Sequence, residues 1–128
     1  MSYYFNTVLD CSFDEAIARV TDELKNEGFG ILSEIDVQAA LKKKLDVDYK
    51  KYTILGACNP HFAFKALQSE EKIGTMLPCN VIVLEKDDGG VEIAAIDPVA
   101  SMQAIDNPDL QGIAQQVQSK LKKAIEAL

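Results

Sequence analysis

Two Cys-Asn pairs carry the side chains of this sequence whose types and spacing could do chemistry. The first, Cys58-Asn59, opens the run "CNPH", which also holds the chain's only histidine, His61. The second, Cys79-Asn80, opens the run "CNVIV". A thiolate is a nucleophile, a redox group and a soft metal ligand. A site built on these pairs would therefore do thiol, redox or metal chemistry, or bind a small ligand.

Asn59 and Pro60 by themselves predict the start of a helix. Asparagine is among the preferred N-cap residues, and proline is favoured at the first helical position because its missing N–H would have no helical partner. Asn107-Pro108 repeats the pair with no cysteine beside it. Helix initiation therefore explains the asparagine and the proline, and it leaves Cys58 unexplained.

Cys58 is predicted to lie at the end of a strand, directly before the N-terminus of that helix. The first-turn amides of His61 and Phe62 lack helical partners, and the helix dipole is positive there. Such a position can lower the pKa of a thiol and can bind an anion through backbone amides. Gly56 would allow a ligand or a backbone to approach closely. Asp97 follows a later strand in what we interpret as a turn, with a carboxylate near the site as the second interpretation.

Other interpretations of the cysteines stay open. A buried free cysteine packs as a small hydrophobe. A dithiol pair requires Cys58 and Cys79 to meet, which they do if their strands are antiparallel and do not if a right-handed crossover makes the strands parallel. A metal site would draw on Cys58, His61 and Cys79, whereas structural zinc takes four ligands. The sequence has no Gly-x-Ser-x-Gly motif, and one histidine without an evident partner does not predict a hydrolase triad.

Composition bounds the fold and the partners. The 128 residues suit a single domain, 1–128, and 48% hydrophobic with 26% charged residues is ordinary for a globular protein. A net charge of −7 disfavours nucleic acid and anionic membrane surfaces, which need clustered lysine and arginine. No apolar run reaches the ~20 residues of a membrane span, and the first residues lack the pattern of a signal peptide. We therefore expect a soluble, cytoplasmic chain whose three cysteines are thiols.

Hydrophobic periodicity and cap residues predict the element order β-α-β-α-β-α-β-β-α. The expected strands are Tyr3 to Leu9, Phe29 to Ile35, Tyr52 to Ala57, Asn80 to Glu85 and Val91 to Ile96. The expected helices begin at the caps Ser12, Asp36, Asn59 and Asn107. Asp88-Gly89 predicts a type I′ turn between the last two strands, with φ > 0 at both residues. The order is typical of an α+β two-layer sandwich, in which helices pack on a mixed five-stranded sheet.

The first and the last predicted helices carry further signals. Gly28 stands where a left-handed C-terminal residue would end the first helix. The last helix has a continuous apolar stripe from Leu110 to Leu128. That stripe could cover the sheet, or part of it could pack against a second subunit.

Three runs resemble the domain of unknown function 302 family. They are "YTILGACNPHFAFKAL" (Tyr52 to Leu67), "IGTMLPCNVIVLE" (Ile73 to Glu85) and "IDPVASM" (Ile96 to Met102). The resemblance covers almost the whole chain and implies a small α+β domain that associates as dimers. It implies no catalytic residue, because none is assigned in the family. The motif positions are Gly56, Cys58, Asn59, Pro60, Leu77, Pro78, Cys79, Asn80, Asp97 and Pro98.

We therefore predict a homodimeric domain that binds a small ligand, with anions among the candidates, at the helix start beside the second Cys-Asn pair. The predicted ligand-binding residues are Gly56, Cys58, Asn59, Pro60, His61, Cys79, Asn80 and Asp97. One alternative is a thiol-dependent redox or metal-handling protein that uses Cys58 and Cys79. Another is a non-catalytic interaction module. We assign no catalytic residue, metal ligand or cofactor, and the sequence does not decide whether the chain is an enzyme.

Overall fold

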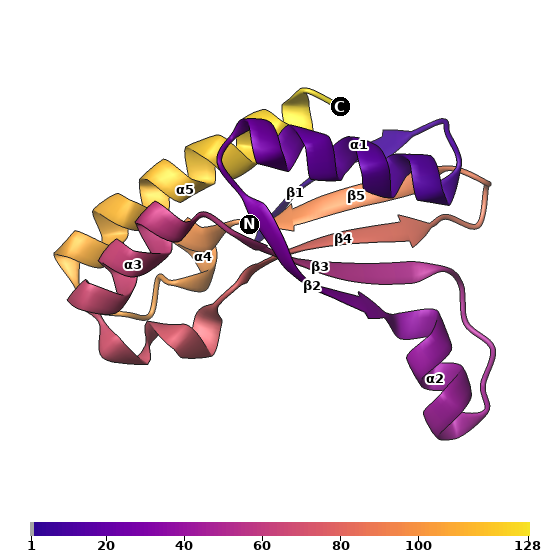
Figure 1. The fold of residues 1–128 in the computed structure, drawn as a ribbon, viewed down its shortest axis with the longest axis horizontal. Helices are drawn as coiled ribbons and strands as arrows, with labels where there is room; N and C mark the ends of the chain where they lie inside the picture. Colours follow the sequence, from indigo (N-terminus) through magenta and orange to yellow (C-terminus); the bar gives the residue numbers. More distant parts are fainter. Residues whose placement is uncertain (1) are drawn as a thin grey trace.

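The predicted order of elements is present in the computed structural model, which describes residues 2–128 (Figure 1). The strands are β1 (Tyr4–Leu9), β2 (Gly30–Asp36), β3 (Tyr52–Cys58), β4 (Cys79–Glu85) and β5 (Val91–Ile96). The predicted helices are α1 (Phe13–Asn26), α2 (Val37–Leu45), α3 (Pro60–Ser69) and α5 (Pro108–Glu126). Two short helices were not predicted, a 3-10 helix η1 (Glu71–Met76) and α4 (Pro98–Ser101).

The five strands form one sheet in the order β1-β5-β4-β3-β2. The α+β class and the five-stranded sheet are thereby confirmed. The expectation of mixed strand directions is wrong, because all four neighbouring pairs are antiparallel. The physical reason lies in the connection from β3 to β4. Its helices α3 and η1 pack beyond the strand ends (Figure 1), so the chain re-enters the sheet at the end where it left.

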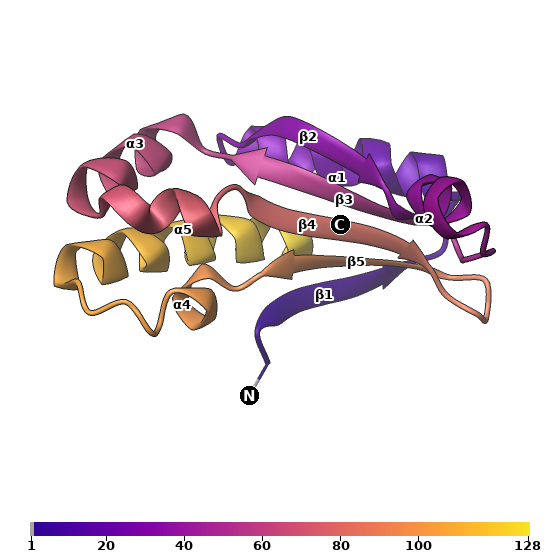
Figure 2. The same ribbon diagram turned by 90° about the horizontal axis from the view of Figure 1, so that it is seen from below.

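One face of the sheet is covered by α1 and α5, and the other face is turned toward the viewer in Figure 2. The covering helices bury the apolar stripes that their periodicity predicts. In α1 the stripe is Ala16, Val20 and Leu24. In α5 it is Leu110, Ala114, Val117, Leu121, Ala124 and Ile125. The main core therefore lies between α1, the C-terminal part of α5 and one side of the sheet.

Local capping fixes where three helices begin. The hydroxyl of Ser12 accepts a hydrogen bond from the Glu15 amide (3.1 Å) at the start of α1. The carboxylate of Asp36 accepts one from the Ala39 amide (2.9 Å) at the start of α2, and Asn107 caps α5 in the same way. Each bond satisfies a first-turn amide that has no helical partner. All three caps were predicted from residue type, and all three are confirmed.

The β4–β5 hairpin differs from its prediction. Gly89 has φ +94°, whereas Asp88 is not among the residues with positive φ in the described range 2–128. The Gly89 amide donates to the Lys86 carbonyl (3.0 Å), and the Lys86 amide donates to the Gly90 carbonyl (2.8 Å). This pattern is a type I turn followed by a bulge rather than a two-residue type I′ turn. In it only one position takes a left-handed conformation, and glycine fills that position.

Within residues 2–128, none of the helices is both long enough and apolar enough to cross a bilayer.

Candidate functional site

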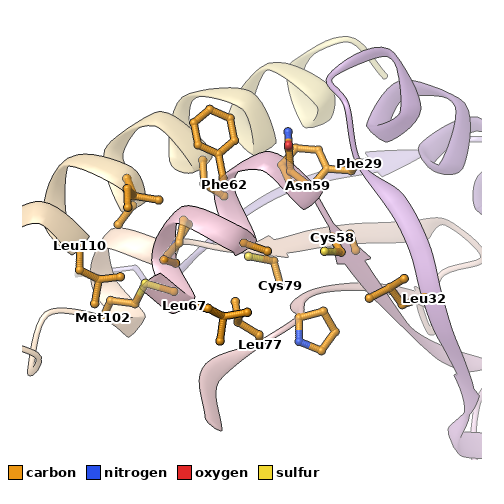
Figure 3. Close-up of a pocket in the computed structure, with 18 residues that line it drawn as sticks. Phe29, Leu32, Cys58, Asn59, Phe62, Leu67, Leu77, Cys79, Met102 and Leu110 are labelled. Carbon is orange, nitrogen blue, oxygen red and sulfur yellow. The ribbon is translucent and has the colours of Figure 1, made fainter. Parts of the chain in front are cut away.

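A cavity of about 270 Å³ lies where α3 and α5 meet the ends of β3 and β4 (Figure 3). It is lined by 18 of the described residues, which come from both layers of the fold. The lining comprises Phe29, Leu32, Ala57, Cys58, Asn59, Phe62, Ala63, Ala66, Leu67, Leu77, Pro78, Cys79, Pro98, Met102, Leu110, Ile113, Ala114 and Val117. Among these 18, Asn59 and the two cysteines carry the polar hydrogen-bonding groups. The cavity is therefore an apolar pocket with one small polar region.

The two cysteines meet at this cavity because β3 and β4 are antiparallel. In the register of this pair, Ala57 lies opposite Cys79, and Gly56 lies opposite Asn80. Cys58 is therefore brought beside Cys79, and both thiols line the cavity (Figure 3). Both are free; Cys58 is half-buried and Cys79 is only 8% exposed. Of the two asparagines, Asn59 lines the cavity and Asn80 does not.

Asn59 occupies the N-cap position of α3, but its side chain does not cap the helix. Its Nδ2 instead donates to the backbone carbonyl of Glu27 (3.2 Å). The prediction that this asparagine caps as Asn107 does is therefore wrong in mechanism. The physical reason is long-range: Glu27 follows the end of α1, where carbonyl groups lack helical partners. The carboxamide satisfies one of them, and the residue is only 8% exposed.

The C-terminus of α1 explains why a glycine lies beside that contact. Gly28 has φ +88°, its amide donates to the Lys25 carbonyl (3.0 Å), and the Phe29 amide donates to the Leu24 carbonyl (2.9 Å). This is a Schellman motif. The left-handed residue that the sequence predicted at Gly28 is thereby confirmed. A Cβ at Gly28 would also lie 3.0 Å from the Asn59 Nδ2. Asn59 thus ties the end of α1 to the junction of β3 and α3.

Five of the predicted ligand-binding residues lie outside the cavity lining. Pro60 and His61 are exposed in the first turn of α3, and Asn80 is exposed on β4. Gly56 is buried in β3, against Ser33 and Pro78. The motif therefore contains both cavity residues and residues with other positions in the fold.

Asp97, the fifth of these residues, begins a helix rather than a turn. It is the N-cap of α4, and its Oδ1 accepts hydrogen bonds from the Val99 amide (3.0 Å) and from the Gln118 Nε2 (3.0 Å). The interpretation as a simple turn is therefore corrected. The second bond links α4 to α5, so Asp97 acts as a structural tie.

The part of the cavity lining that comes from α5 was not predicted from the sequence. Leu110 and Ala114 of α5 pack with Ala66, Ile73 and Met102 in a second buried cluster, separate from the core over the sheet. The length of α5 could have indicated this second cluster. Its 19 residues span roughly 28 Å, whereas strands of six or seven residues span roughly 20–23 Å. The first turns of α5 must therefore extend past the sheet and require other partners.

Burial sets the protonation of Cys79. Loss of solvent raises the pKa of the Cys79 thiol to about 11, and the neighbouring Cys58 adds a smaller effect in the same direction. Cys79 is thus a neutral thiol at physiological pH and a poor nucleophile. No group of three or more His, Cys, Asp or Glu side chains within 2–128 is arranged to hold a metal ion.

The raised pKa of Cys79 makes stability depend on alkaline pH. The folded chain retains this proton up to about pH 11, whereas the unfolded chain releases it near the ordinary value of 9.0. The stabilisation is therefore fully present below pH 9 and is lost as pH rises through 11. We expect the difference in unfolding free energy between wild type and Cys79→Ala to shrink by about 2–3 kcal/mol over this window.

Urea unfolding with reductant at pH 8 to 11 measures this difference. Cys58→Ala is the matched control, because it leaves Cys79 buried and burial is the larger cause of the shift. That variant should retain most of the wild-type pH dependence. A wild-type minus Cys79→Ala difference that stays constant across the range would show that Cys79 is not desolvated.

The fold and the cavity define a class of protein. It is an α+β domain with an antiparallel sheet, helices over one face, and an apolar pocket beyond the strand ends. The chain belongs to the family described as "Domain of unknown function DUF302", whose model matches residues 5–128. The resemblance inferred from the Cys-Asn runs is thereby confirmed.

Two relatives illustrate the family. The chain is similar to the crystal structure of an uncharacterized conserved protein DUF302 from Bacillus stearothermophilus, with a TM-score of 0.91, 27% identity and 98% of each chain covered. It is also 31% identical over 85 residues to an uncharacterized protein of Aquifex aeolicus. That match spans 63% of this chain and 59% of the Aquifex protein.

Proposed function

We propose that this chain binds a small, predominantly apolar molecule in the cavity beside Cys58. The observation that carries the proposal is the pocket itself, about 270 Å³ in volume and lined by aliphatic, aromatic and thiol side chains. Concave, mainly apolar pockets with a few polar groups are the usual form of small-molecule sites. The volume exceeds the ~150 Å³ of a cavity that accommodates benzene, so a molecule up to about twice as large as benzene would fit.

The mouth of the cavity supports the same ligand class. Leu32 and Leu67 line it and are 70% and 45% exposed. Exposed apolar side chains at the rim of a pocket are typical of sites that receive apolar ligands. A ligand that covered these two leucines would gain about 25 cal/mol per Å² of apolar surface removed from water.

The lining disfavours the anion that the helix start suggested. None of the 18 described lining residues carries a positive charge, and the chain as a whole carries −7. The polar groups of the lining are the Cys58 and Cys79 thiols and the Asn59 carboxamide, whose Nδ2 is already bonded to Glu27. These groups suit one hydroxyl or carbonyl group on an otherwise apolar molecule.

Titration with 1-alkanols from hexanol to decanol tests the proposal. We expect a chain length that fits the cavity to raise the melting temperature by about 3–5 °C when its concentration is ten times its Kd. Inorganic phosphate should have no such effect. A response to phosphate and not to any alkanol would favour the anion site instead.

A cavity-filling variant assigns the effect to this cavity. Ala63→Leu places a larger side chain in the lining and should abolish the alkanol response. The matched control is Ala18→Leu, because Ala18 is also helical and is exposed on α1, away from the cavity. If Ala63→Leu responds as Ala18→Leu does, the alkanols bind elsewhere and the proposal fails.

A second candidate function is thiol redox chemistry, which the position of both thiols at one cavity supports. The raised pKa of Cys79 opposes it, because a protonated thiol does not attack. Oxidation by diamide would join the two sulfurs, with both thiol hydrogens passing to the reagent. Mass spectrometry without reductant would detect the disulfide as the loss of two hydrogen atoms from the chain. For both candidate functions we propose a cytoplasmic location, because a reducing compartment keeps such thiols free.

A further inference from the structure

The sheet face opposite α1 and α5 is apolar. We call this surface the open face, and Figure 2 looks onto it. Its side chains alternate with those that point into the core: Val81 and Val83 of β4 are fully buried, whereas Ile82 and Leu84 between them are only half-buried. The apolar side chains of the open face are Tyr4, Val8, Ile35, Tyr52, Ile54, Ile82, Leu84, Ala94 and Ile96.

This composition differs from that of a solvated sheet. Antiparallel sheets with one wet face alternate apolar residues toward the core with polar residues toward water. Here the central row across the sheet joins Ile35, Ile54, Ile82 and Ala94 through register pairs and ends at Asn6 on β1. The other polar side chains of this face, Ser33, Asn80 and Glu92, lie in the neighbouring rows. A contiguous apolar surface of this kind marks an interaction site.

The open face is almost uncharged. A shallow groove of about 380 Å³ crosses it, and Glu92 is the one charged side chain among the described residues that line this groove. Its carboxylate accepts a hydrogen bond from the Asn6 Nδ2 (2.8 Å) and lies 3.9 Å from the Lys86 Nζ. Two chains that each carry −7 repel one another over most of their surfaces. They meet with least repulsion at a neutral face.

A projecting arm lies on the same side of the sheet. The arm consists of residues 37–51, that is, α2 and the segment after it, and both ribbon views place it beside the open face (Figures 1 and 2). None of the residues of α2 is buried. Leu45, Val47 and Tyr49 are 66%, 43% and 43% exposed. The arm contacts its own chain only lightly, through β3 and the Tyr49–Tyr52 ring pair. A nine-residue helix gains little stability alone, so this arm would gain from packing against a further surface.

We propose that two copies of the chain pack open face to open face, with the arm of each copy against the sheet of the other. Two sheets that pack face to face lie ~10 Å apart and cross at about −30°. A two-fold arrangement of this kind gives four layers, helices outside and two sheets inside. The five strands outline roughly 500 Å². With the arm added, each copy approaches the ~800 Å² that one partner contributes to a standard interface.

Light scattering on the full chain tests the assembly. At about 50 μM, well above the ~1 μM Kd of a modest interface, the wild type should have twice the 14.0 kDa mass of one chain. Val8→Lys and Ile35→Lys should shift the mass to that of one chain. These side chains are already 51% and 49% exposed within the protomer, so a lysine there should disturb assembly and leave the fold intact.

Phe64→Lys is the matched control, because Phe64 is 64% exposed on α3, away from the open face. It should remain dimeric, and far-UV circular dichroism should show all three variants folded. A monomeric wild type would overturn the proposal, as would a dimer that neither Val8→Lys nor Ile35→Lys dissociates. If only Phe64→Lys dissociated the dimer, the interface would lie on α3, and the proposal would also be overturned.

Discussion

Replacing Leu110 with alanine is expected to lower the free energy of unfolding by about 3 kcal/mol and to enlarge the cavity. Leu110 is fully buried, lines the cavity, and belongs to the second apolar cluster. Leucine-to-alanine changes in cores cost the lost transfer free energy together with a term for the empty volume. Because Leu110 already borders a cavity, we expect a cost near the lower end of the usual range. Urea unfolding measures it directly.

The same variant should bind longer ligands. The volume of the lost methine and two methyl groups becomes available, so the 1-alkanol that stabilises best should be about two or three carbons longer than for the wild type. Leu121→Ala is the matched control. Leu121 is equally buried on α5 but packs in the core over the sheet, outside the cavity lining. It should lose comparable or greater stability with no change in preferred chain length. A shift in both variants would mean that the alkanols report general loosening of the fold.

Replacing Gly56 with alanine is expected to destabilise the fold by about 2–3 kcal/mol. A Cβ at this position would overlap Ser33 Oγ and would lie 2.7 Å from Pro78 Cγ. The exposed Ser33 hydroxyl can rotate to another χ1 rotamer, which relieves part of the overlap. The Pro78 ring cannot rotate away in this manner, and it leads directly into β4. The glycine predicted as part of a ligand site is thus required by packing between three chain segments.

Gly30→Ala is the control for that substitution. Gly30 lies in β2, a Cβ added there would have nothing within 4 Å, and its φ is not in the left-handed region. Alanine there should be neutral or stabilising by about 0.4–1 kcal/mol, because it reduces the entropy of the unfolded chain. The double variant Gly56→Ala/Ser33→Gly should regain part of the lost stability in thermal unfolding. If Gly56→Ala is as stable as Gly30→Ala, the inference that close packing at this position requires glycine is wrong.

The elements of this protein could be predicted because their causes are local. The caps Ser12, Asp36 and Asn107 each bond to amides two or three residues away. The Schellman end at Gly28 depends on neighbours within one helical turn. The stripes of α1 and α5 follow the 3.6-residue period of a helix. Such signals are complete within a short window of sequence, so strand and helix positions agree with the structure to within one or two residues.

The direction of the strands was not decided locally. The pattern of β3 and β4 suits parallel and antiparallel pairing alike, and only the position of α3 and η1 beyond the strand ends selects the antiparallel arrangement. The same arrangement brings Cys58 and Cys79 to one cavity. Asn59 shows most clearly why local sequence signals are insufficient, because its hydrogen-bond partner Glu27 lies 32 residues earlier in the chain. Identical Asn-Pro dipeptides therefore make different contacts at α3 and α5.

By itself, the sequence determined the α+β class, the position of each main element, the family, and the two Cys-Asn pairs as the region to examine. Only the tertiary structure decided that the cysteines line an apolar cavity, that Asn80 and His61 lie outside it, and that one sheet face is apolar and open. The physical reason is the range of the interactions involved. Caps and periodicity act over one turn, whereas a cavity and a sheet face exist only where segments distant in sequence pack together.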